Sequence, residues 1–466
     1  MLFSSLTFLL FFLPMVLALY YIVPSKGRNA LLLAASLLFY AWGEPVYIIA
    51  MVWVILMVYV GALVIDSLKK TNARQYVLIF TVSSILGTLA YFKYMGFILQ
   101  NLPSFNGIDI PFVEIIMPIG ISFYTFQAVS YIVDVYRGDV RVQKNPFKVA
   151  LFISLFPQLV AGPIVKYHDV CEQLDRRSVC FDSFIKGVKR FIIGLGKKII
   201  IANTLGEVVD KIFALRVDEL SPQLAWVGAV FYAMQLYYDF SGYSDMAIGL
   251  GHMFGFKFLE NFNYPYISKS ITEFWQRWHM SLSTWFKQYV YIPLGGNRGG
   301  KIKTLRNLAI VFFLTGLWHG AAWNFIVWGM YHGAFIILEK ATGLFGRQMT
   351  VFSRALGHIY LLGVVVVGWV IFRAPDLTYA WQYIRMMFGL YQGQPAYTLT
   401  YYVTYWSGCI FAIAVLCSAG LFKSVLLNAR QTTAVVVINV YLLGMFVFCL
   451  MNLVNVSYNP FIYFRF

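Results

Sequence analysis

Long apolar runs constrain this chain more than any other feature of its sequence. A helix that crosses a bilayer needs about 20 apolar residues, and shorter pieces are possible where protein surrounds them. This rule predicts spans at residues 5–23, 30–42, 46–66, 76–98, 115–136, 185–204, 223–241, 305–318, 321–338, 356–373, 403–422 and 433–453. Since 60% of the 466 residues are hydrophobic and 12% are charged, the chain has too few charges to cover a water-soluble globule. We therefore predict an all-α polytopic membrane protein.

Basic residues are concentrated in two connecting segments, and this predicts which side of the membrane each segment faces. Residues 137–198 hold twelve Lys and Arg against five Asp and Glu, and residues 257–306 hold eight against two. Cytoplasmic loops carry such an excess. We expect these two segments inside and both termini outside. Because the basic residues lie between apolar runs, the net charge of +16 indicates orientation in the membrane and not nucleic-acid binding.

Residues 147–165 (FKVALFISLFPQLVAGPIV) are apolar, yet basic residues flank them on both sides. Pro157, Gly162 and Pro163 interrupt the helical pattern. Broken backbone is tolerated at membrane depth where it is buried in protein or lines a cavity. We expect this segment to enter the membrane and return on the same side.

Residues 273–333 concentrate polar and aromatic groups inside this apolar chain. They contain three of the six histidines, His279, His319 and His332, each near Trp, Tyr or Gly. A single intramembrane histidine is more often a polar contact between helices, but three together favour a functional site. We expect His332 to lie nearer a membrane face and to have a structural role.

Aromatic and apolar residues at intervals of three and four predict one interfacial helix in the first part of this segment, residues 273–300. An anchor helix explains Trp and Lys at headgroup level but not His279 in its middle. The segment ends in IPLGGNRGG, where glycines allow close backbone approach and Arg298 is a candidate phosphate contact.

Two further motifs carry polar groups. His319 lies between Trp318 and Gly320, where the glycine leaves room beside the imidazole for a helix or a substrate. Residues 237–245 (YYDFSGYSD) contain Asp239 and Asp245, which either cap the start of a helix or hold a histidine or arginine of an active centre in position.

At these residues the chain resembles the membrane-bound O-acyltransferase (MBOAT) family, and within it the bacterial branch that acts in alginate O-acetylation. The motifs that carry the resemblance are MLFSSLTFLLFFLP, FPQLVAGPI, QLYYDFSGYSDMAIG, FWQRWHMSLSTWFKQYVYIPLGGNRGG and LTGLWHGAAWNFIVWGMYHG. It implies re-entrant and interfacial helices around a central tunnel, with about 11 to 13 transmembrane helices by the span rule. We expect one domain over residues 1–466, with a catalytic core near 147–340 and an extracytoplasmic tail at 454–466.

The resemblance also implies roles for individual residues. His319 matches the catalytic histidine of the family, and His279 matches its second conserved polar position, with Asp239 and Trp318 in support. Acetyl-CoA is the implied donor, reached through a tunnel open to the cytoplasm, and no bound cofactor or metal is expected. The candidate contacts to its phosphates are Lys269, Arg277, Lys287 and Arg298.

The chain ends in NPFIYFRF, which is similar to the Phe-x-Tyr-x-x-Phe tail of a small partner protein in the D-alanylation machinery. This similarity implies that Tyr463 carries an acyl group outside the membrane. The alternative is an interfacial aromatic belt that closes the final helix, and the sequence leaves both open.

By this resemblance the chain is an inner-membrane acetyltransferase that moves acetyl from cytoplasmic acetyl-CoA across the membrane to an extracellular or cell-wall polysaccharide, with alginate favoured. Because the chain has no Gly-Asp-Ser block, the expected partner is a separate extracytoplasmic SGNH-type acetyltransferase, and membrane lipids surround the protein. D-alanyl transfer to teichoic acid is the alternative. A transporter without chemistry is more distant, because it predicts inverted repeats and paired broken helices, of which only one broken element is visible.

Overall fold

The computed structural model describes residues 1–68, 71–101, 115–160, 162–344, 350–395, 397–421, 432–455 and 458–460, without the side chains of 432–434. In these ranges the chain forms helices and connecting loops, and no strand occurs among them. The predicted all-α class is confirmed.

Each of the twelve predicted spans coincides with a helix. These are η1 (Phe8–Phe12) with α1 (Leu13–Ile22), α2 (Arg28–Gly43), α3 (Ile48–Ser67), α4 (Ala73–Asn101), α5 (Ile121–Arg137), α9 (Phe181–Gly196) with η3 (Lys197–Ala202), α11 (Pro222–Met253), α14 (Gly300–His319), α15 (Trp323–Thr342), α16 (Val351–Arg373), α19 (Tyr405–Ser418) and α21 (Thr432–Asn455). Among the described residues, α3, α4, α16 and most of α21 are long and apolar enough to cross a membrane alone. The total number of crossings stays a prediction.

Shorter helices join these elements. They are η2 (Ser25–Gly27), α6 (Pro146–Ser154), α7 (Phe156–Leu159), α8 (Tyr167–Asp175), α10 (Asn203–Phe213), η4 (Val217–Glu219), η5 (Pro265–Ile267), α12 (Ile271–Arg277), α13 (Met280–Phe286), η6 (Lys287–Tyr291), α17 (Leu377–Met387) and α18 (Leu399–Tyr402).

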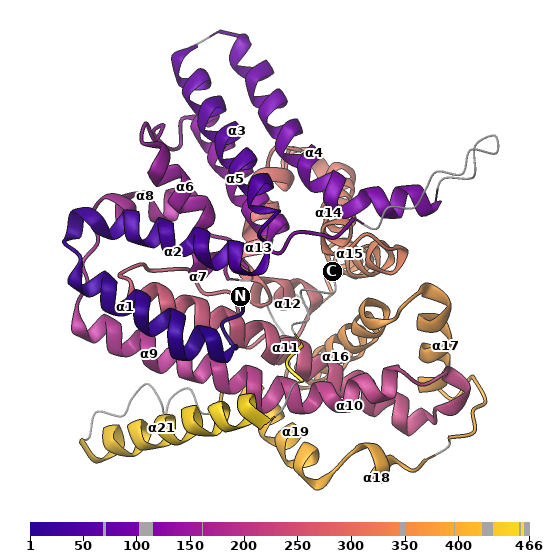
Figure 1. The fold of residues 1–466 in the computed structure, drawn as a ribbon. Helices are drawn as coiled ribbons and strands as arrows, with labels where there is room; N and C mark the ends of the chain where they lie inside the picture. The colour runs from indigo at the N-terminus through magenta and orange to yellow at the C-terminus, as the bar shows by residue number, and fades with distance from the viewer. Residues whose placement is uncertain are drawn as a thin grey trace. The chain divides into compact units, whose positions relative to one another are not determined.

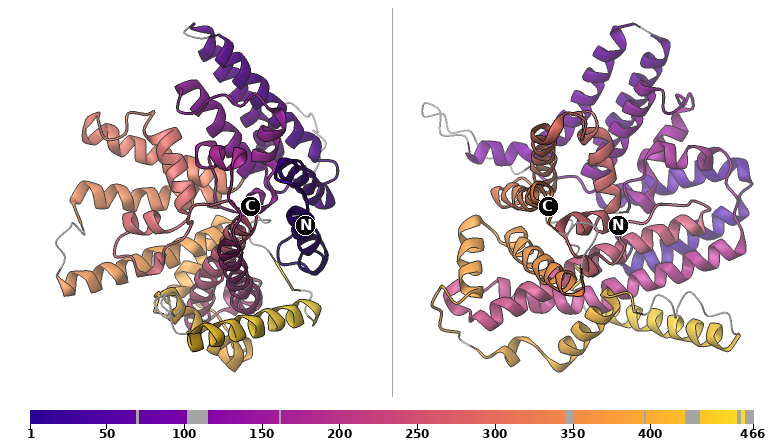
Figure 2. Two further views of the ribbon diagram at one scale, coloured as in Figure 1. Left: turned by 90° about the vertical axis from the view of Figure 1, so that its left-hand side faces the viewer. Right: turned by 180° about the vertical axis from the view of Figure 1, so that it is seen from behind.

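The described chain divides into two compact units. The first holds Met1–Phe191 and Ser244–Leu259, and the second holds Ile192–Tyr243 and Glu260–Phe466, so α9 and α11 each contribute to both. In the first unit α3, α4 and α5 pack against one another (Figure 1). In the second unit α14 and α15 pack together as a helical hairpin (Figure 1, Figure 2).

The broken segment predicted at residues 147–165 is present in the first unit. α6 ends at Ser154 and α7 begins at Phe156, so the helix breaks just before Pro157. The side-chain amide of Gln158 donates to the carbonyl of Phe152 at 2.5 Å, and the Phe156 N–H donates to the hydroxyl of Ser36 at 3.1 Å. These contacts satisfy the freed backbone groups inside the protein. Whether the segment returns to the same side of a membrane stays a prediction.

α11 is longer than predicted. The predicted span ends at residue 241, whereas the helix continues to Met253. Small polar residues such as Ser241 and Ser244 interrupt the apolar run, but both are buried by packing. Asp239 and Asp245 therefore lie inside a helix, and the interpretation that they cap a helix start is wrong.

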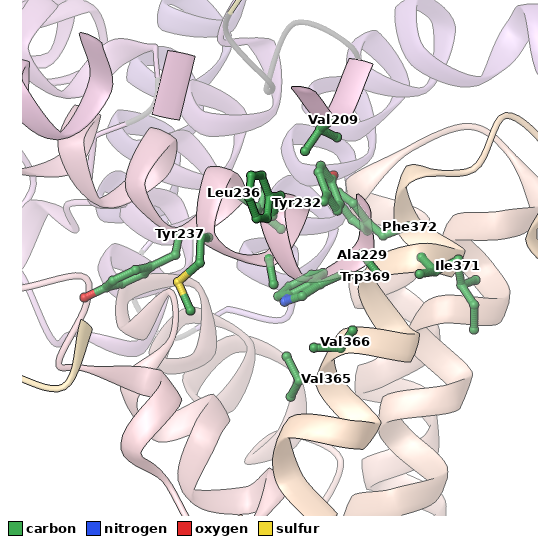
Figure 3. Packing of buried hydrophobic residues seen from close by; sticks show 14 of the residues in the cluster. Val209, Ala229, Tyr232, Leu236, Tyr237, Val365, Val366, Trp369, Ile371 and Phe372 are labelled. Carbon is green, nitrogen blue, oxygen red and sulfur yellow. The ribbon is translucent and has the colours of Figure 1, made fainter. Parts of the chain in front are cut away.

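The core of the second unit forms where α10, α11 and α16 meet. Figure 3 shows Trp369 and Phe372 of α16 facing Tyr232 and Leu236 of α11, with Val209 of α10 above them. Burial of large aromatic side chains contributes much of the packing energy of such a core. This aromatic core extends toward the end of α14, where His319 lies.

Candidate active site

The α14–α15 hairpin fixes the position of His319. A Cβ atom added to Gly316 would lie 2.4 Å from the carbonyl oxygen of Phe325, and one added to Gly329 would lie 2.4 Å from that of Phe312. Only residues without a side chain let two helix backbones approach this closely. α14 ends at His319 and α15 begins at Trp323, so the histidine lies at the tight end of the hairpin.

His319 lies inside an aromatic cage. Its ring centroid is 4.9 Å from Trp318, 4.9 Å from Trp328 and 5.3 Å from Phe372, and each pair packs close to perpendicular. The side chain is only 6% exposed. Edge-to-face packing holds the imidazole in one orientation, and the surrounding apolar surface restricts access of water to it.

Gly320 serves the packing of this cage. A Cβ atom there would lie 2.2 Å from the ring of Phe325, so this ring fills the space that the sequence analysis reserved for a helix or a substrate beside His319.

His279 lies at a break between two helices. The sequence predicts one continuous helix over residues 273–300, but α12 ends at Arg277 and α13 begins at Met280. The single-helix prediction is wrong because periodicity reports only which residues are apolar, and α12 and α13 both satisfy it. His279 itself has the left-handed conformation with φ 44° and ψ 54°, which is unfavourable for a residue with a Cβ atom.

Asn261 holds the break in place. Its side-chain oxygen lies 3.1 Å from His279 Nδ1, 3.2 Å from the Ser281 backbone N–H and 2.9 Å from the Ser281 hydroxyl. Its backbone carbonyl accepts from the N–H of Met280 at 2.9 Å. Three donors around one side-chain oxygen, together with this backbone bond, overcome the strain of the left-handed residue.

These hydrogen bonds also determine the tautomer of His279. The Ser281 N–H can only donate, so the Asn261 atom that it meets is an oxygen and not the amide nitrogen. His279 Nδ1 must then donate to the same oxygen, which leaves Nε2 as the ring nitrogen with a lone pair. Nε2 has no hydrogen-bond partner in the described part of the chain.

Trp318 packs near both candidate catalytic histidines. Its ring centroid is 6.1 Å from that of His279 and 4.9 Å from that of His319. Phe240 of α11 also packs against His279, and the centroids of these two rings are 4.6 Å apart. Three residues chosen from the sequence, His279, His319 and Trp318, therefore belong to one cluster.

Glu339 anchors α12, which precedes His279, onto α15. Its two carboxylate oxygens accept the N–H groups of Ile271 and Thr272 at 2.6 and 2.9 Å, and the Thr272 hydroxyl at 2.6 Å. A carboxylate at this position accepts hydrogen bonds from free N–H groups at the helix start. Its negative charge also interacts favourably with the positive end of the helix dipole. Local sequence patterns do not reveal this role of Glu339, because its partners are 67 and 68 residues away.

Asp239 is paired with a lysine. Its carboxylate lies 2.6 Å from Lys198 Nζ, and both side chains are 2% exposed. Lys198 also donates to the backbone carbonyl of Pro460. The sequence predicts a histidine or an arginine as the partner of Asp239 and Asp245, and Asp245 does pair with Arg190 at 2.7 Å. Lys198 as the partner of Asp239 was not predicted, although a lysine inside the apolar run 185–204 is a usable signal.

The four candidate contacts to the phosphates of acetyl-CoA differ in their exposure and in their hydrogen bonds within the protein. Arg277 donates to Glu273 at 2.9 Å and to the carbonyl of Asn263 at 3.1 Å. Lys269 is half-buried, and its backbone N–H donates to the Glu273 carboxylate at 3.0 Å. Lys287 and Arg298 are exposed. The two exposed cations are therefore the ones most accessible to a phosphate, whereas Arg277 already has partners within the protein.

His332 is completely buried in the second unit. Its ring packs at 5.4 Å from Trp275 and 5.2 Å from Trp328, measured between centroids, and a Cβ atom on Gly368 would lie 2.7 Å from its Nε2. The structural role of His332 and its place near a membrane face stay predictions.

The start of the C-terminal tail is tied to η3 and α10. The Tyr458 hydroxyl donates to Asp210 at 2.7 Å, and Asn203 donates to the Tyr458 carbonyl at 3.3 Å. Tyr463, the predicted acyl carrier, lies outside the described residues. In the described ranges no group of three His, Cys, Asp or Glu side chains is arranged to hold a metal ion.

Comparisons with known proteins show which enzymes the chain is similar to. The chain is 47% identical to the probable alginate O-acetylase AlgI of Azotobacter vinelandii over 394 residues, which are 83% of this chain and 78% of that protein. It is 35% identical to the peptidoglycan O-acetyltransferase of Helicobacter pylori over 84% of this chain and 80% of that protein. The teichoic acid D-alanyltransferase of Bacillus subtilis is 32% identical over 46% of this chain and 56% of that protein.

A model of the membrane-bound O-acyltransferase family matches residues 140–381, which include both candidate catalytic histidines, the broken segment and the α14–α15 hairpin. This match covers more than half of the chain. The chain therefore belongs to the membrane-bound O-acyltransferase family and is a multi-pass membrane enzyme that transfers an acyl group to oxygen.

Proposed function

We propose that this enzyme takes acetyl from cytoplasmic acetyl-CoA and passes it across the inner membrane for O-acetylation of a polysaccharide, with alginate favoured. Two relatives named as O-acetylating enzymes, which are similar over more than four fifths of the chain, support acetyl as the group and a glycan as its destination. D-alanyl transfer to teichoic acid is the alternative, and the two relatives of that kind are 32% and 28% identical over only 46% and 58% of the chain.

The observation that carries this proposal is the closed aromatic cage around His319. The imidazole takes a proton from the acceptor hydroxyl while that oxygen attacks the carbonyl carbon of the thioester. The tetrahedral intermediate then breaks its C–S bond, and the leaving thiolate takes the proton from the imidazolium. General-base catalysis of this kind contributes about 10²- to 10⁴-fold. Trp318, Trp328 and Phe372 restrict water at the imidazole, which suppresses hydrolysis of the thioester.

His279 has a different role in this proposal. Its Nδ1–H is committed to Asn261, so Nε2 is an acceptor and not a donor. An acceptor does not stabilise a developing oxyanion, but it does bind an amide N–H. The pantetheine arm of coenzyme A carries two amides. We assign His279 the role of orienting this arm so that the thioester lies beside Trp318 and His319.

The phosphates of the donor remain outside this cage on the cytoplasmic side. Lys287 and Arg298 are the exposed cations of the basic segment, with Lys269 and Arg277 as secondary candidates. Exposed cations suit a donor that must bind and leave in every cycle, because such contacts add little barrier to release.

After transfer, the acetyl group reaches the polysaccharide through a second protein. The proposal places Tyr463 as the first acceptor and a separate extracytoplasmic SGNH-type acetyltransferase as the partner that receives acetyl from it. Support comes from the described residues of this tail, because Tyr458 and Pro460 are hydrogen-bonded within the second unit.

The test is mass spectrometry of the full-length purified protein after incubation with labelled acetyl-CoA. Native protein, His319→Ala, Tyr463→Phe and His168→Ala are compared. His168 is an exposed histidine of α8 and serves as the matched control, so His168→Ala is expected to behave as native. We expect acetyl on Tyr463 in the native protein and its loss in His319→Ala.

Other outcomes separate the parts of this proposal. Consumption of acetyl-CoA in Tyr463→Phe at the native rate, with partner and glycan added, would show that transfer bypasses the tail. If the protein accepts an acyl group from a carrier-protein thioester and does not react with acetyl-CoA, D-alanyl transfer becomes the function in place of acetyl transfer. Full activity of His319→Ala would remove His319 as the base.

A further inference from the structure

An open groove of about 370 Å³ lies on the α14–α15 hairpin. Its lining residues are all apolar and comprise Ala309 of α14 and residues of α15 between Met330 and Ala341. On α15 they recur at intervals of three and four, so they form one stripe along the helix. Met330 and Ala334 of this stripe are exposed. The groove therefore opens to the surroundings of the protein, and His319 is not among its lining residues.

The length of the groove matches one leaflet of a bilayer. Met330 and Ala341 are eleven residues apart on α15, which is about 16 Å along a helix. The hydrocarbon core of a bilayer is about 30 Å thick, so the acyl chains of one leaflet span about half of that. In a membrane enzyme the groove is thus long enough to hold most of one acyl chain.

Two cations lie at one end of the groove. Lys340 directly precedes Ala341, the last lining residue of α15, and it is exposed. Arg306 is exposed too and lies one helical turn before Ala309 on α14. Because α14 and α15 form a hairpin, the start of α14 lies beside the end of α15 (Figure 1). Both cations therefore lie at the same end.

The loop before α14 brings these cations together. The side-chain amide of Asn307, which is completely buried, donates to the carbonyl of Gly296 at 3.1 Å. Arg306 donates to the Asn307 side-chain oxygen at 3.0 Å, and Lys340 donates to the Asn297 side-chain oxygen at 3.2 Å. The guanidinium and the ammonium are thus fixed on one loop, and each keeps further N–H donors for a ligand.

No acidic side chain neutralises this end of the groove. In the parts of the chain that the structure describes, neither Arg306 nor Lys340 forms an ion pair with a carboxylate. Glu339 is next to Lys340 in the sequence but is buried, and its oxygens accept hydrogen bonds from Ile271 and Thr272. An apolar groove that ends at two unneutralised cations is complementary to an amphipathic anion.

We propose that this groove binds one phospholipid with an anionic head group. One acyl chain lies along the stripe from Met330 to Ala341, and the lipid phosphate contacts Arg306 and Lys340. The sequence predicts that residues 257–306 face the cytoplasm, so the lipid comes from the cytoplasmic leaflet. This site is independent of the acetyl donor and of the acceptor, and a lipid bound there stabilises the hairpin that ends at His319.

The test measures which lipid the full-length protein retains. Protein in a neutral detergent is mixed with equal amounts of phosphatidylglycerol and phosphatidylcholine that carry the same acyl chains, and native mass spectrometry counts the first bound lipid. Native protein is compared with Arg306→Gln, Lys340→Gln and the double variant. Lys303→Gln is the matched control, because Lys303 is also exposed but lies about 120° around α14 from Ala309.

We expect native protein to prefer phosphatidylglycerol about twentyfold. Each single variant should lower this preference about fivefold, and the double variant should abolish it. Lys303→Gln should change the preference less than about twofold, because its charge is directed away from the groove. Since Arg306 and Lys340 are exposed, the variants are expected to fold, and a monodisperse elution profile checks this.

A second measurement locates the lipid. Phosphatidylglycerol with a photoreactive group in one acyl chain is cross-linked to the protein, and the labelled peptides are identified. We expect labels between Met330 and Ala341. Ala334→Trp fills the groove and should lower this labelling at least about fivefold, whereas Ala30→Trp, at an exposed alanine of α2, should not.

Four results would overturn the lipid site. Equal retention of both lipids by native protein would remove the selectivity, and an equal loss in Lys303→Gln would reduce it to general surface charge. Displacement of phosphatidylglycerol by inorganic phosphate or by acetyl-CoA would assign the two cations to a soluble anion. A dimer that forms only without bound lipid and is lost in Ala334→Trp would make the groove a contact between two copies of the chain.

Discussion

The two candidate catalytic histidines are held in place by different forces. His319 lies at the end of a helical hairpin whose backbones touch at Gly316 and Gly329, and its ring is fixed by aromatic packing. His279 lies at a strained break and is fixed by hydrogen bonds to Asn261. Apolar packing suits a catalytic base because it excludes water from the imidazole. A polar partner suits a residue that must present one particular ring nitrogen, because the hydrogen bond determines the tautomer. The support around each histidine thus matches its proposed role.

The largest expected effect comes from breaking the packed region. Gly329→Val adds a side chain whose Cβ lies 2.4 Å from the Phe312 carbonyl, so α14 and α15 must separate. We expect loss of folded protein, measured as a fall in thermal unfolding temperature and in monodisperse yield. Gly363→Val is the matched control, because a Cβ atom on Gly363 in α16 meets nothing within 4 Å. Equal behaviour of the two variants would contradict the role given to close helix approach.

Removing the polar support should affect activity more than stability. Asn261→Leu deletes the acceptor for His279 Nδ1 and Ser281, so the imidazole loses its tautomer and orientation. We expect a 10- to 100-fold fall in acetyl transfer, roughly the effect of losing a residue that orients a ligand. Radiometric transfer from acetyl-CoA measures it.

Asn261→Asp is the control for that variant, because it keeps an acceptor oxygen at the same place. It should retain more activity than Asn261→Leu. If both lose activity equally, the hydrogen bond to Nδ1 does not determine the function of His279.

The smallest expected effect concerns backbone strain. His279 has φ 44°, which glycine adopts freely and alanine does not. His279→Gly should therefore be more stable than His279→Ala by about 1 kcal/mol, measured by thermal or denaturant unfolding. Both variants lack the imidazole, so both should have lost its contribution to orienting the acetyl donor to the same degree. A more stable alanine variant would mean that the break relaxes once the imidazole is gone.

The sequence could predict features that depend on local residue patterns. The twelve spans were visible because each apolar run is a local property, and the cluster of His279, Trp318 and His319 was indicated by unusual polar residues in apolar surroundings. The end of α11 was missed because burial of Ser241 and Ser244 depends on the helices packed around them.

Partners that are distant in the sequence could not be predicted from local patterns. Asn261 meets His279 across 18 residues, and Glu339 meets Ile271 across 68. An asparagine or a glutamate in isolation gives no signal of this kind, because its partner is chosen by tertiary packing. The break at His279 was missed for the same reason, since the apolar spacing of three to four continues through it.

The most direct test of the central claim separates binding of acetyl-CoA from its chemistry. The dissociation constant of acetyl-CoA and the transfer rate at saturation are measured for native protein, His319→Ala and His279→Ala. We predict that His319→Ala loses about 10²- to 10⁴-fold in rate with an unchanged dissociation constant. His279→Ala should mainly weaken acetyl-CoA binding. Weakened binding in His319→Ala with a native saturating rate would contradict the assignment of the base, and the same change in both variants would contradict the division of roles.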